Sequence, residues 1–229
     1  MTDGERSRLR WAGAAALAAA ALVFAADVVM LGLPVSGAEA ASADLGALSA
    51  LPGWRLRVGG YGAFLIPAFI VGVWQLYEGV RPAGARWSVP PFLLLSNFFA
   101  AGAVYHYLLA FAVAAAEAQG GDGARTVWEA ARGYLLVPFG VCVFSLTACS
   151  LWFAAAVLFR RTHFPRRMAL LSPALPIGAA IAVTWSLPAP AGGYLFPAAI
   201  HLATPVIFGT STALLWNVGR DCSNPAARW

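Results

Sequence analysis

Three ionisable residues lie inside long apolar stretches of the sequence: Asp27, His106 and His201. A charged side chain at the centre of a bilayer costs about 2.5–3.5 kcal/mol on insertion scales, so such a residue indicates function. A carboxylic acid that stays protonated when buried can serve as a general acid, and an imidazole can accept the final proton. We therefore predict that Asp27, His106 and His201 are catalytic.

The same three residues have the side-chain types of a metal site. Two histidines and one carboxylate can form the facial triad of Fe(II) oxygenases, and three such ligands with an open position are typical of catalytic Zn²⁺. The residues belong to three separate apolar segments and form no local metal-binding motif. The sequence thus favours cofactor-free chemistry without a metal, with a metal site on Asp27, His106 and His201 as the alternative.

The elements that must position these residues are long apolar segments. Hydrophobic residues make up 60% of the chain and charged residues 11%, against roughly 25% charged in soluble domains. About 20 apolar residues are needed for a helix to cross a bilayer. We predict an all-α, polytopic membrane helix bundle of a single domain, 1–229, with six transmembrane helices at Trp11–Leu33, Val58–Val80, Val89–Ala118, Gly133–Phe159, Met168–Leu187 and Pro197–Val218.

The arginines indicate the orientation of this bundle. All 15 basic residues are arginine, and eleven of them, including Arg220 and Arg228, fall on the side of the predicted topology that holds both termini. The positive-inside rule therefore places both termini in the cytoplasm. The arginines are scattered over short loops and form no basic helix or patch, which argues against nucleic-acid binding.

The positions of the three ionisable residues along their helices suggest a shared depth. At about 1.5 Å per residue, Asp27 lies about 24 Å from the cytoplasmic start of the first helix, and His106 about 22 Å from that of the third. His201 lies about 6 Å below the outer start of the sixth helix, and Thr184 and Trp185 fall in the same layer. We expect Asp27, His106 and His201 to meet in the outer half of the membrane.

The third apolar segment carries a face suited to such a site. Phe99, Gly102, His106, Ala110 and Glu117 follow helical spacing, so they should lie on one side of the helix. Glu117 is a fourth catalytic candidate, although an exposed charge at the membrane interface explains its position equally well. By contrast, Glu78 lies three residues before Arg81, a spacing that predicts a surface ion pair.

Aromatic residues are abundant at the depth of the ionisable residues. Rings around an acid would hold a lipophilic substrate and stabilise positive charge by about 0.5–2 kcal/mol each. The predicted substrate-binding residues are Tyr61, Phe64, Phe99, Tyr105, Tyr107, Thr184 and Trp185. The expected partners are the lipid bilayer and a lipophilic small molecule.

Four stretches give the chain a resemblance to a group of uncharacterised bacterial six-span membrane proteins: FAADVVMLG, GAVYHYLLA, THFPRRMALLSP and LPAPAGGYLFPAAIHL. In size, span number and buried acids the chain also resembles, more loosely, the bacterial membrane-bound terpene cyclases of drimentine-type indole-terpenoid pathways. These resemblances imply a multi-pass protein of the bacterial inner membrane. The second implies a metal-independent enzyme in which an acidic residue protonates a prenyl chain.

Three classes of function stay open at this stage. The preferred one is a terpene cyclase-like membrane enzyme that performs proton-initiated cyclisation or isomerisation of an isoprenoid, without a cofactor. The alternatives are a metal-dependent lipid hydrolase or oxygenase, and a non-enzymatic protein that binds a ligand or couples to protons. Since the chain has no lysine, a retinal Schiff base is excluded.

Overall fold

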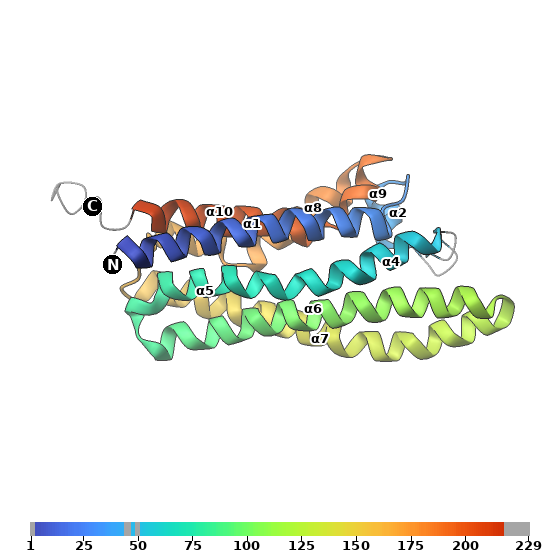
Figure 1. Ribbon diagram of the computed structural model, residues 1–229, viewed down its shortest axis with the longest axis horizontal. Coiled ribbons are helices and arrows are strands. Elements are labelled where there is room, and N and C mark those ends of the chain that lie inside the picture. Colours follow the sequence, from blue (N-terminus) through green and yellow to red (C-terminus); the bar gives the residue numbers. More distant parts are fainter. Residues whose placement is uncertain (1–2, 44–46, 49–50, 218–229) are drawn as a thin grey trace.

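The computed structural model describes residues 3–43, 47–48 and 51–217, and these residues form helices without any β-strand. Long helices lie side by side along the molecule, joined by shorter segments (Figure 1). The helices are α1 (Asp3–Leu31), α2 (Gly37–Ala41), α4 (Gly53–Gly62), α5 (Phe69–Val80), α6 (Ala85–Gln119), α7 (Gly121–Phe159), α8 (Ala174–Ser186), α9 (Ala191–Leu195) and α10 (Ala199–Asn217). Three 3₁₀ segments, η1 (Ala63–Ala68), η2 (Arg81–Ala83) and η3 (Arg166–Leu171), connect some of them.

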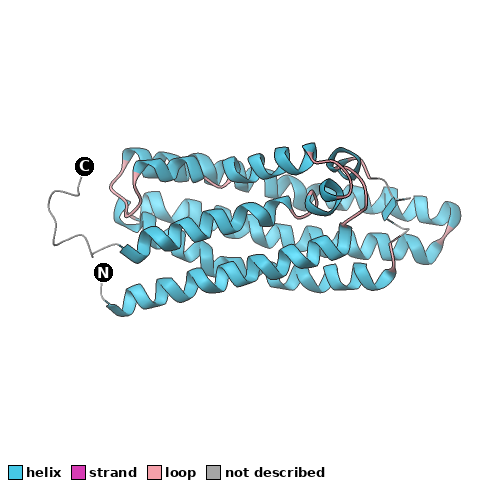
Figure 2. Cartoon of the chain, turned by 90° about the horizontal axis from the view of Figure 1, so that it is seen from above, coloured by secondary structure: helices cyan, strands magenta, loops and turns pink. Residues whose placement is uncertain are grey.

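The helices form a bundle in which both described ends of the chain lie at the same end (Figure 1). Helices α6 and α7 make an antiparallel hairpin along one side, and α1 packs against α10 on the other. The α4–η1–α5 segment lies between α1 and α6. Seen from above, the connecting loops gather towards the ends of the bundle (Figure 2). This arrangement brings α1, α6 and α10, the helices of Asp27, His106 and His201, around one interior.

Among the described residues, five helices are long and apolar enough to cross a membrane. They correspond to α1, the α4–η2 segment, α6, α7 and α10. The segment predicted as a fifth span, Met168–Leu187, is instead divided between η3 and α8, and α8 has 13 residues. The break falls at Ser172, whose backbone is extended (φ −55°, ψ 132°) because the following Pro173 disfavours the helical conformation there.

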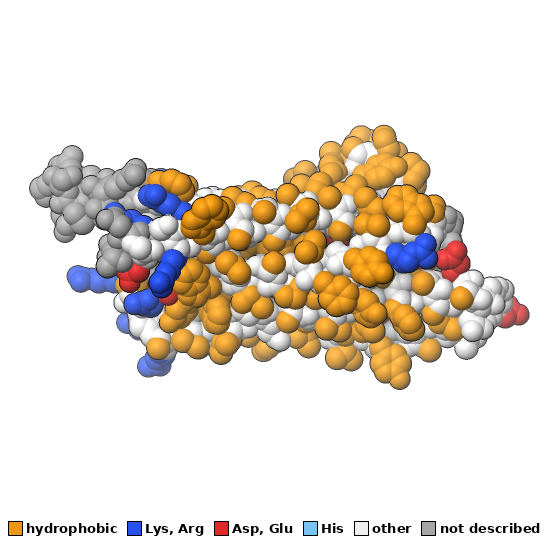
Figure 3. All heavy atoms as spheres, viewed as in Figure 1, with side chains coloured by type: hydrophobic (Ala, Val, Ile, Leu, Met, Phe, Trp, Pro, Cys, Tyr) orange, Lys and Arg blue, Asp and Glu red, His pale blue; other side chains and the backbone are white. Residues whose placement is uncertain are grey.

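The surface has the distribution expected of a multi-pass membrane protein. Apolar side chains cover its flank, whereas arginines gather at the end that holds both described ends of the chain (Figure 3). At this arginine-rich end, the guanidinium of Arg10 lies 3.8 Å from the Trp216 ring and that of Arg160 4.5 Å from the Trp87 ring. Such cation–π pairs are worth about 0.5–1 kcal/mol at exposed sites. Arg220 and Arg228, which entered the orientation argument, lie outside the described residues.

A buried polar network fixes α1, α5 and α10 against one another. Gln75 is fully buried, and its side-chain amide donates to the carbonyl of Leu9 (3.0 Å) and to the hydroxyl of Thr212 (2.9 Å). Its carbonyl oxygen accepts from the hydroxyl of Ser211 at 3.0 Å. Because a buried amide must be hydrogen-bonded, this network sets the register between the helices that carry Asp27 and His201.

Pro67 interrupts the second span. It lies inside η1, where the helix tightens to 3₁₀ geometry between α4 and α5. A proline cannot donate a backbone hydrogen bond and its ring crowds the preceding turn. The interruption places Ile66 and Phe69 on either side of it, and both pack near the candidate site described below.

Candidate metal centre

Asp27 lies in the last turns of α1 and is 2% exposed. The carbonyl groups at a helix C-terminus lack partners within the helix. Here the guanidinium of Arg55, from α4, donates hydrogen bonds to the carbonyls of Val29 and Gly32. Arg55 thus stabilises the end of α1 with its own positive charge, as expected for a cation at this position, and fixes the turns that carry Asp27.

The two carboxylate oxygens of Asp27 each face one histidine. Oδ1 lies 3.4 Å from Nδ1 of His106 on α6, and Oδ2 lies 3.1 Å from Nε2 of His201 on α10. One ligand atom from each residue lies within 4.8 Å of the other two. Helices α1, α6 and α10 therefore bring Asp27, His106 and His201 into one cluster, which we call the Asp–His–His cluster.

Aromatic neighbours hold both imidazoles in place. The ring of His201 stacks on Phe69 with centroids 5.6 Å apart and planes inclined by 5°. The ring of His106 meets Tyr105 edge-on at 6.0 Å. The two imidazoles are 6.2 Å apart between centroids. These contacts restrict rotation of the rings, so their nitrogens stay directed towards Asp27.

Two polar atoms of the cluster are buried and have no hydrogen-bond partner among the described residues: Asp27 Oδ2 and His201 Nδ1. Asp27 Oδ2 makes no hydrogen bond to a described residue although it lies close to His201 Nε2. Buried polar atoms are almost always satisfied, and an exception often marks a functional site or an ion. The free lone pair of Asp27 Oδ2 is therefore suited to binding a further group.

The spacing of the cluster fits a transition-metal ion. Bonds of about 2.0–2.1 Å in a tetrahedral site place neighbouring ligand atoms about 3.3 Å apart. The two distances from the Asp27 carboxylate to the histidine nitrogens, 3.1 Å from Oδ2 and 3.4 Å from Oδ1, are close to this value, and one ligand atom from each of the three residues lies within 4.8 Å of the others. Two imidazoles and one carboxylate form the donor set of open Zn²⁺ sites and of non-haem Fe(II) sites.

An apolar cavity of about 400 Å³ adjoins the cluster. His106 and His201 line it, whereas Asp27 does not. Small-molecule sites generally have about 300–1,000 Å³ and mostly apolar walls. The remaining walls come from the end of α1, η1, α6, α7, α8, the segment before α10 and the start of α10, and include Phe98, Phe99, Gly102, Tyr105, Phe139, Cys142, Val143, Ile177, Ile181 and Phe196.

Of the predicted substrate-binding residues, Phe99 and Tyr105 line this cavity and the others do not. The side chains of Tyr61, Phe64, Tyr107 and Trp185 are exposed on the flank of the bundle. Tyr107 illustrates the reason: it follows His106 directly, and a helix turns by about 100° per residue, so its ring leaves the site.

Thr184 is also placed away from the cavity. It is buried, and its hydroxyl donates to the carbonyl of Ala180 within its own helix at 2.8 Å. Its backbone packs against Gly37, where an added Cβ would lie 2.0 Å from the Thr184 carbonyl oxygen. Thr184 therefore supports the contact between α8 and the start of α2.

Glu117 does not join the Asp–His–His cluster. Eleven residues separate it from His106, which corresponds to about 16 Å along the helix axis. It lines a separate, more open groove between α4 and α6, together with Arg57, Tyr61 and Tyr107. The predicted common face of α6 is therefore divided between two sites. Phe99, Gly102 and His106 line the cavity, whereas Ala110 and Glu117 line the groove.

Several residues of the site are missed by the sequence argument. Phe69, which stacks on His201, and the cavity residues Cys142, Phe139 and Phe196 are apolar or weakly polar side chains in apolar segments. Residue type alone gives them no distinguishing signal. Their role follows from helix packing, which the sequence does not specify.

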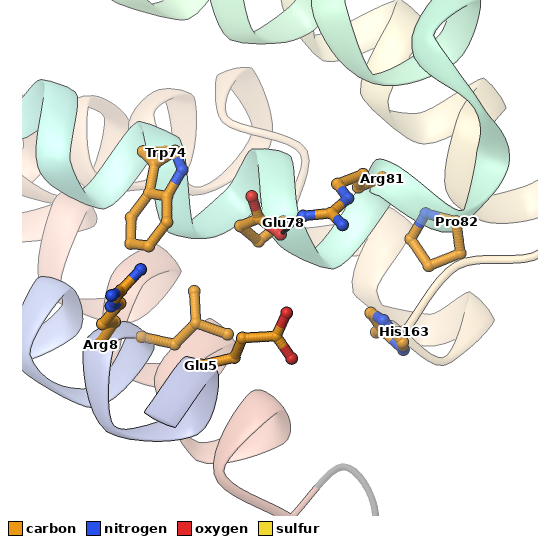
Figure 4. Close-up of a pocket in the computed structure, with 8 residues that line it drawn as sticks. Glu5, Arg8, Trp74, Glu78, Arg81, Pro82 and His163 are labelled. Carbon is orange, nitrogen blue, oxygen red and sulfur yellow. Dashed lines mark hydrogen bonds and ion pairs between the residues drawn. The ribbon is translucent and has the colours of Figure 1, made fainter. Parts of the chain in front are cut away.

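A second cavity, of about 470 Å³, lies at the arginine-rich end (Figure 4). Glu78 and Arg81 form the predicted ion pair there at 2.8 Å. Partial burial lowers the pKa of the nearby His163, an effect to which Arg81 adds and which Glu78 opposes. The charged groups around this cavity come from α1, α5, η2 and the loop after α7, and are exposed or partly exposed.

Fold and site together define a multi-pass helical membrane protein with a buried cluster of two histidines and a carboxylate beside an apolar cavity. Residues 1–217 match the model of a family of unknown function, DUF6796, and the chain belongs to this family. The comparison with curated proteins gave no match. The comparison with solved structures gave none either.

Proposed function

We propose that this protein is an intramembrane metalloenzyme that hydrolyses an ester or amide bond of a lipophilic substrate. Asp27, His106 and His201 would bind one divalent ion, with Zn²⁺ as the first candidate. The observation that carries the proposal is the convergence of three ligand atoms within 4.8 Å at the wall of an apolar cavity.

The position of Asp27 favours this proposal over proton-initiated cyclisation. A general acid must reach the atom that it protonates. Asp27 does not line the cavity, and an imidazole stands at each of its oxygens. Asp27 is therefore better placed to bind an ion between itself and the histidines than to protonate a substrate directly.

A bound Zn²⁺ supplies a Lewis acid and makes a coordinated water nucleophilic near neutral pH. The chain supplies ligand orientation and a binding space for the substrate. Phe69 and Tyr105 orient the imidazoles, and the apolar walls exclude bulk water and hold the hydrocarbon part of the substrate. His106 and His201 line the cavity, so a substrate bound there would lie beside two of the residues that would hold the ion.

Metal analysis tests the proposal directly. The wild-type protein, purified in detergent without chelator, should contain about one divalent ion per chain. Asp27→Ala, His106→Ala and His201→Ala should each lose most of it. His163→Ala is the matched control, because His163 lies in the loop after α7. Equal metal content in all variants would refute the proposal.

A terpene cyclase-like activity is the second candidate function, and the aromatic walls of the cavity favour it. Phe98, Phe99, Tyr105, Phe139 and Phe196 surround the space beside the histidines, and rings can stabilise a carbocation. Membranes incubated with linear prenylated substrates would then form a product with the mass of the substrate but a different retention time. The product would be lost in Asp27→Asn and unaffected by chelator, which separates this activity from metal-dependent hydrolysis.

We also propose the cellular setting that the sequence suggests. The protein would reside in the bacterial inner membrane with six spans, α8 crossing together with its flanking segments. The arginine-rich end would face the cytoplasm, because positively charged residues are retained on that side. The distribution of arginines on the surface supports this orientation (Figure 3).

A further inference from the structure

The cavity beside the Asp–His–His cluster reaches the flank of the bundle between α7 and α8. Three of its lining residues are also exposed: Phe139 (52%) and Val143 (51%) on α7, and Ile181 (39%) on α8. Helix α7 packs extensively against α6 but only sparsely against α8. The wall of the cavity is therefore thin on this side.

This thin wall lies at the depth of the hydrocarbon. Val143 precedes the end of α7 at the arginine-rich end by 16 residues, or about 24 Å of helix. The neighbouring exposed side chains on the same helix, Val137 and Phe144, are apolar. A solute that passes between α7 and α8 would thus come from the lipid rather than from water.

Gly102 keeps the cavity open opposite this wall. It lies in the interior of α6 and lines the cavity, and an added Cβ would meet no atom within 4 Å. A glycine within a helix costs about 0.5–1 kcal/mol relative to alanine. Close helix packing explains Gly59 and Gly72, where a Cβ would clash with a neighbouring helix, but it does not explain Gly102. The open space beside Gly102 is available to a ligand.

The walls of the cavity indicate the charge of that ligand. Apart from the two histidines, every residue that lines it is uncharged, and most are apolar. Away from the histidines, a charged headgroup would be buried there without a counter-ion, which costs several kcal/mol. An acyl or prenyl chain with a neutral ester or amide meets no such penalty.

We propose that the ligand of this cavity is an uncharged lipid that enters sideways from the bilayer between α7 and α8. The nature of the reacting group, an ester or amide at His106 and His201, rests on the function proposed above. The route and the neutral character of the ligand rest on the cavity itself. Binding can therefore be tested without metal or turnover.

Photo-crosslinking in nanodiscs provides the test. The probe is a diacylglycerol with a diazirine in one acyl chain, and labelled residues are located by mass spectrometry. We expect labels on the cavity walls around Gly102 and Cys142. Val143→Trp, which places a large ring at the entrance, should reduce this labelling at least fivefold. Val137→Trp is the matched control, because Val137 is 67% exposed on the same helix but does not line the cavity.

A second pair of variants covers the other side of the entrance. Ile181→Trp should reduce labelling, whereas Val183→Trp, exposed on the same helix outside the cavity, should not. Only variants that keep the wild-type elution volume and melting temperature are compared. Equal labelling of entrance and control variants in both pairs would overturn the lateral route.

The charge of the probe tests the ligand class. In metal-free protein, a diazirine phosphatidic acid of the same chain length should label the cavity at least fivefold less than the diacylglycerol. Equal or stronger labelling by the anionic probe would overturn the neutral class. Cavity labelling in a protein that binds no metal would refute the metalloenzyme and leave the lipid route supported. Metal binding without cavity labelling would refute the lipid route and leave the metalloenzyme supported.

Discussion

Asp27 Oδ2 on α1 and His201 Nε2 on α10 lie 3.1 Å apart, although the two residues come from opposite ends of the sequence. The contact depends on the packing of α1 against α10, which the Gln75 network holds in register. Both side chains are at most 4% exposed. A pair so deeply buried and so poorly hydrogen-bonded is expensive to maintain, which argues for a role in binding.

Metal removal should lower the thermal stability of the wild-type protein. A ligand present at a hundred times its dissociation constant stabilises the folded state by about 2.7 kcal/mol. In a chain of this length that corresponds to roughly 5–10 °C in melting temperature. Differential scanning fluorimetry with and without a chelator measures the shift. His201→Ala should show no chelator effect, and a shift of equal size in that variant would contradict the assignment of the ligands.

Arg55→Ala should destabilise the end of α1 and weaken metal binding. The substitution leaves the carbonyls of Val29 and Gly32 without their charged donor, at a cost of about 1–3 kcal/mol. Since these turns carry Asp27, the dissociation constant for Zn²⁺ should rise as well. Arg57→Ala is the control, because Arg57 is exposed on the same helix. Similar behaviour of the two variants would indicate a general charge effect.

Gln75→Leu should lower the free energy of unfolding by about 1–3 kcal/mol. The substitution has nearly the same volume but removes the partner of Leu9 and Ser211 inside the bundle. Thermal or chemical denaturation in detergent measures the loss. The metal affinity of the same variant should also be measured, because the network lies at a distance from the cluster along α1. An unchanged affinity would mean that the effect is confined to the network, and a lower affinity would mean that it extends to the cluster. Unchanged stability would show that the network is not required for packing.

The arginine-rich end should be accessible from the cytoplasm. In a Cys222→Ser background, which removes the native cysteine near the C-terminus, Thr162→Cys places a thiol in the loop after α7, between the arginines at 160–161 and 166–167. A membrane-impermeant maleimide should label it in inverted vesicles and not in intact cells. Ala118→Cys, near the far end of α6, should show the opposite pattern. The reverse result for both would invert the proposed orientation.

Gly102→Leu should fill the cavity without displacing the cluster. An added Cβ finds open space there, and leucine favours helix more than glycine does. We therefore expect unchanged metal content, an unchanged or slightly higher melting temperature, and loss of cavity labelling by the neutral probe. A drop in metal content would show that Gly102 serves the geometry of the cluster.

The membrane class and a common level for Asp27, His106 and His201 were predicted from the sequence. Long apolar runs require membrane or core burial, and the rise of about 1.5 Å per residue is a constant of the helix. This constant placed Asp27, His106 and His201 at one level. The sequence also proposed Glu117 for the site because of the shared face of α6, whereas the structure places Glu117 at a separate groove.

The tertiary structure decided which way each helix faces and which helices touch. Lipid and protein interior are equally apolar, so a membrane helix has no strong hydrophobic side that reveals its orientation. For this reason the aromatic residues of the right depth divided between the cavity, as with Phe99 and Tyr105, and the outer flank, as with Tyr107 and Trp185. The capping of α1 by Arg55 and the stacking of Phe69 on His201 join residues far apart in the chain. Such contacts depend on helix rotation and packing, which depth along the sequence does not determine.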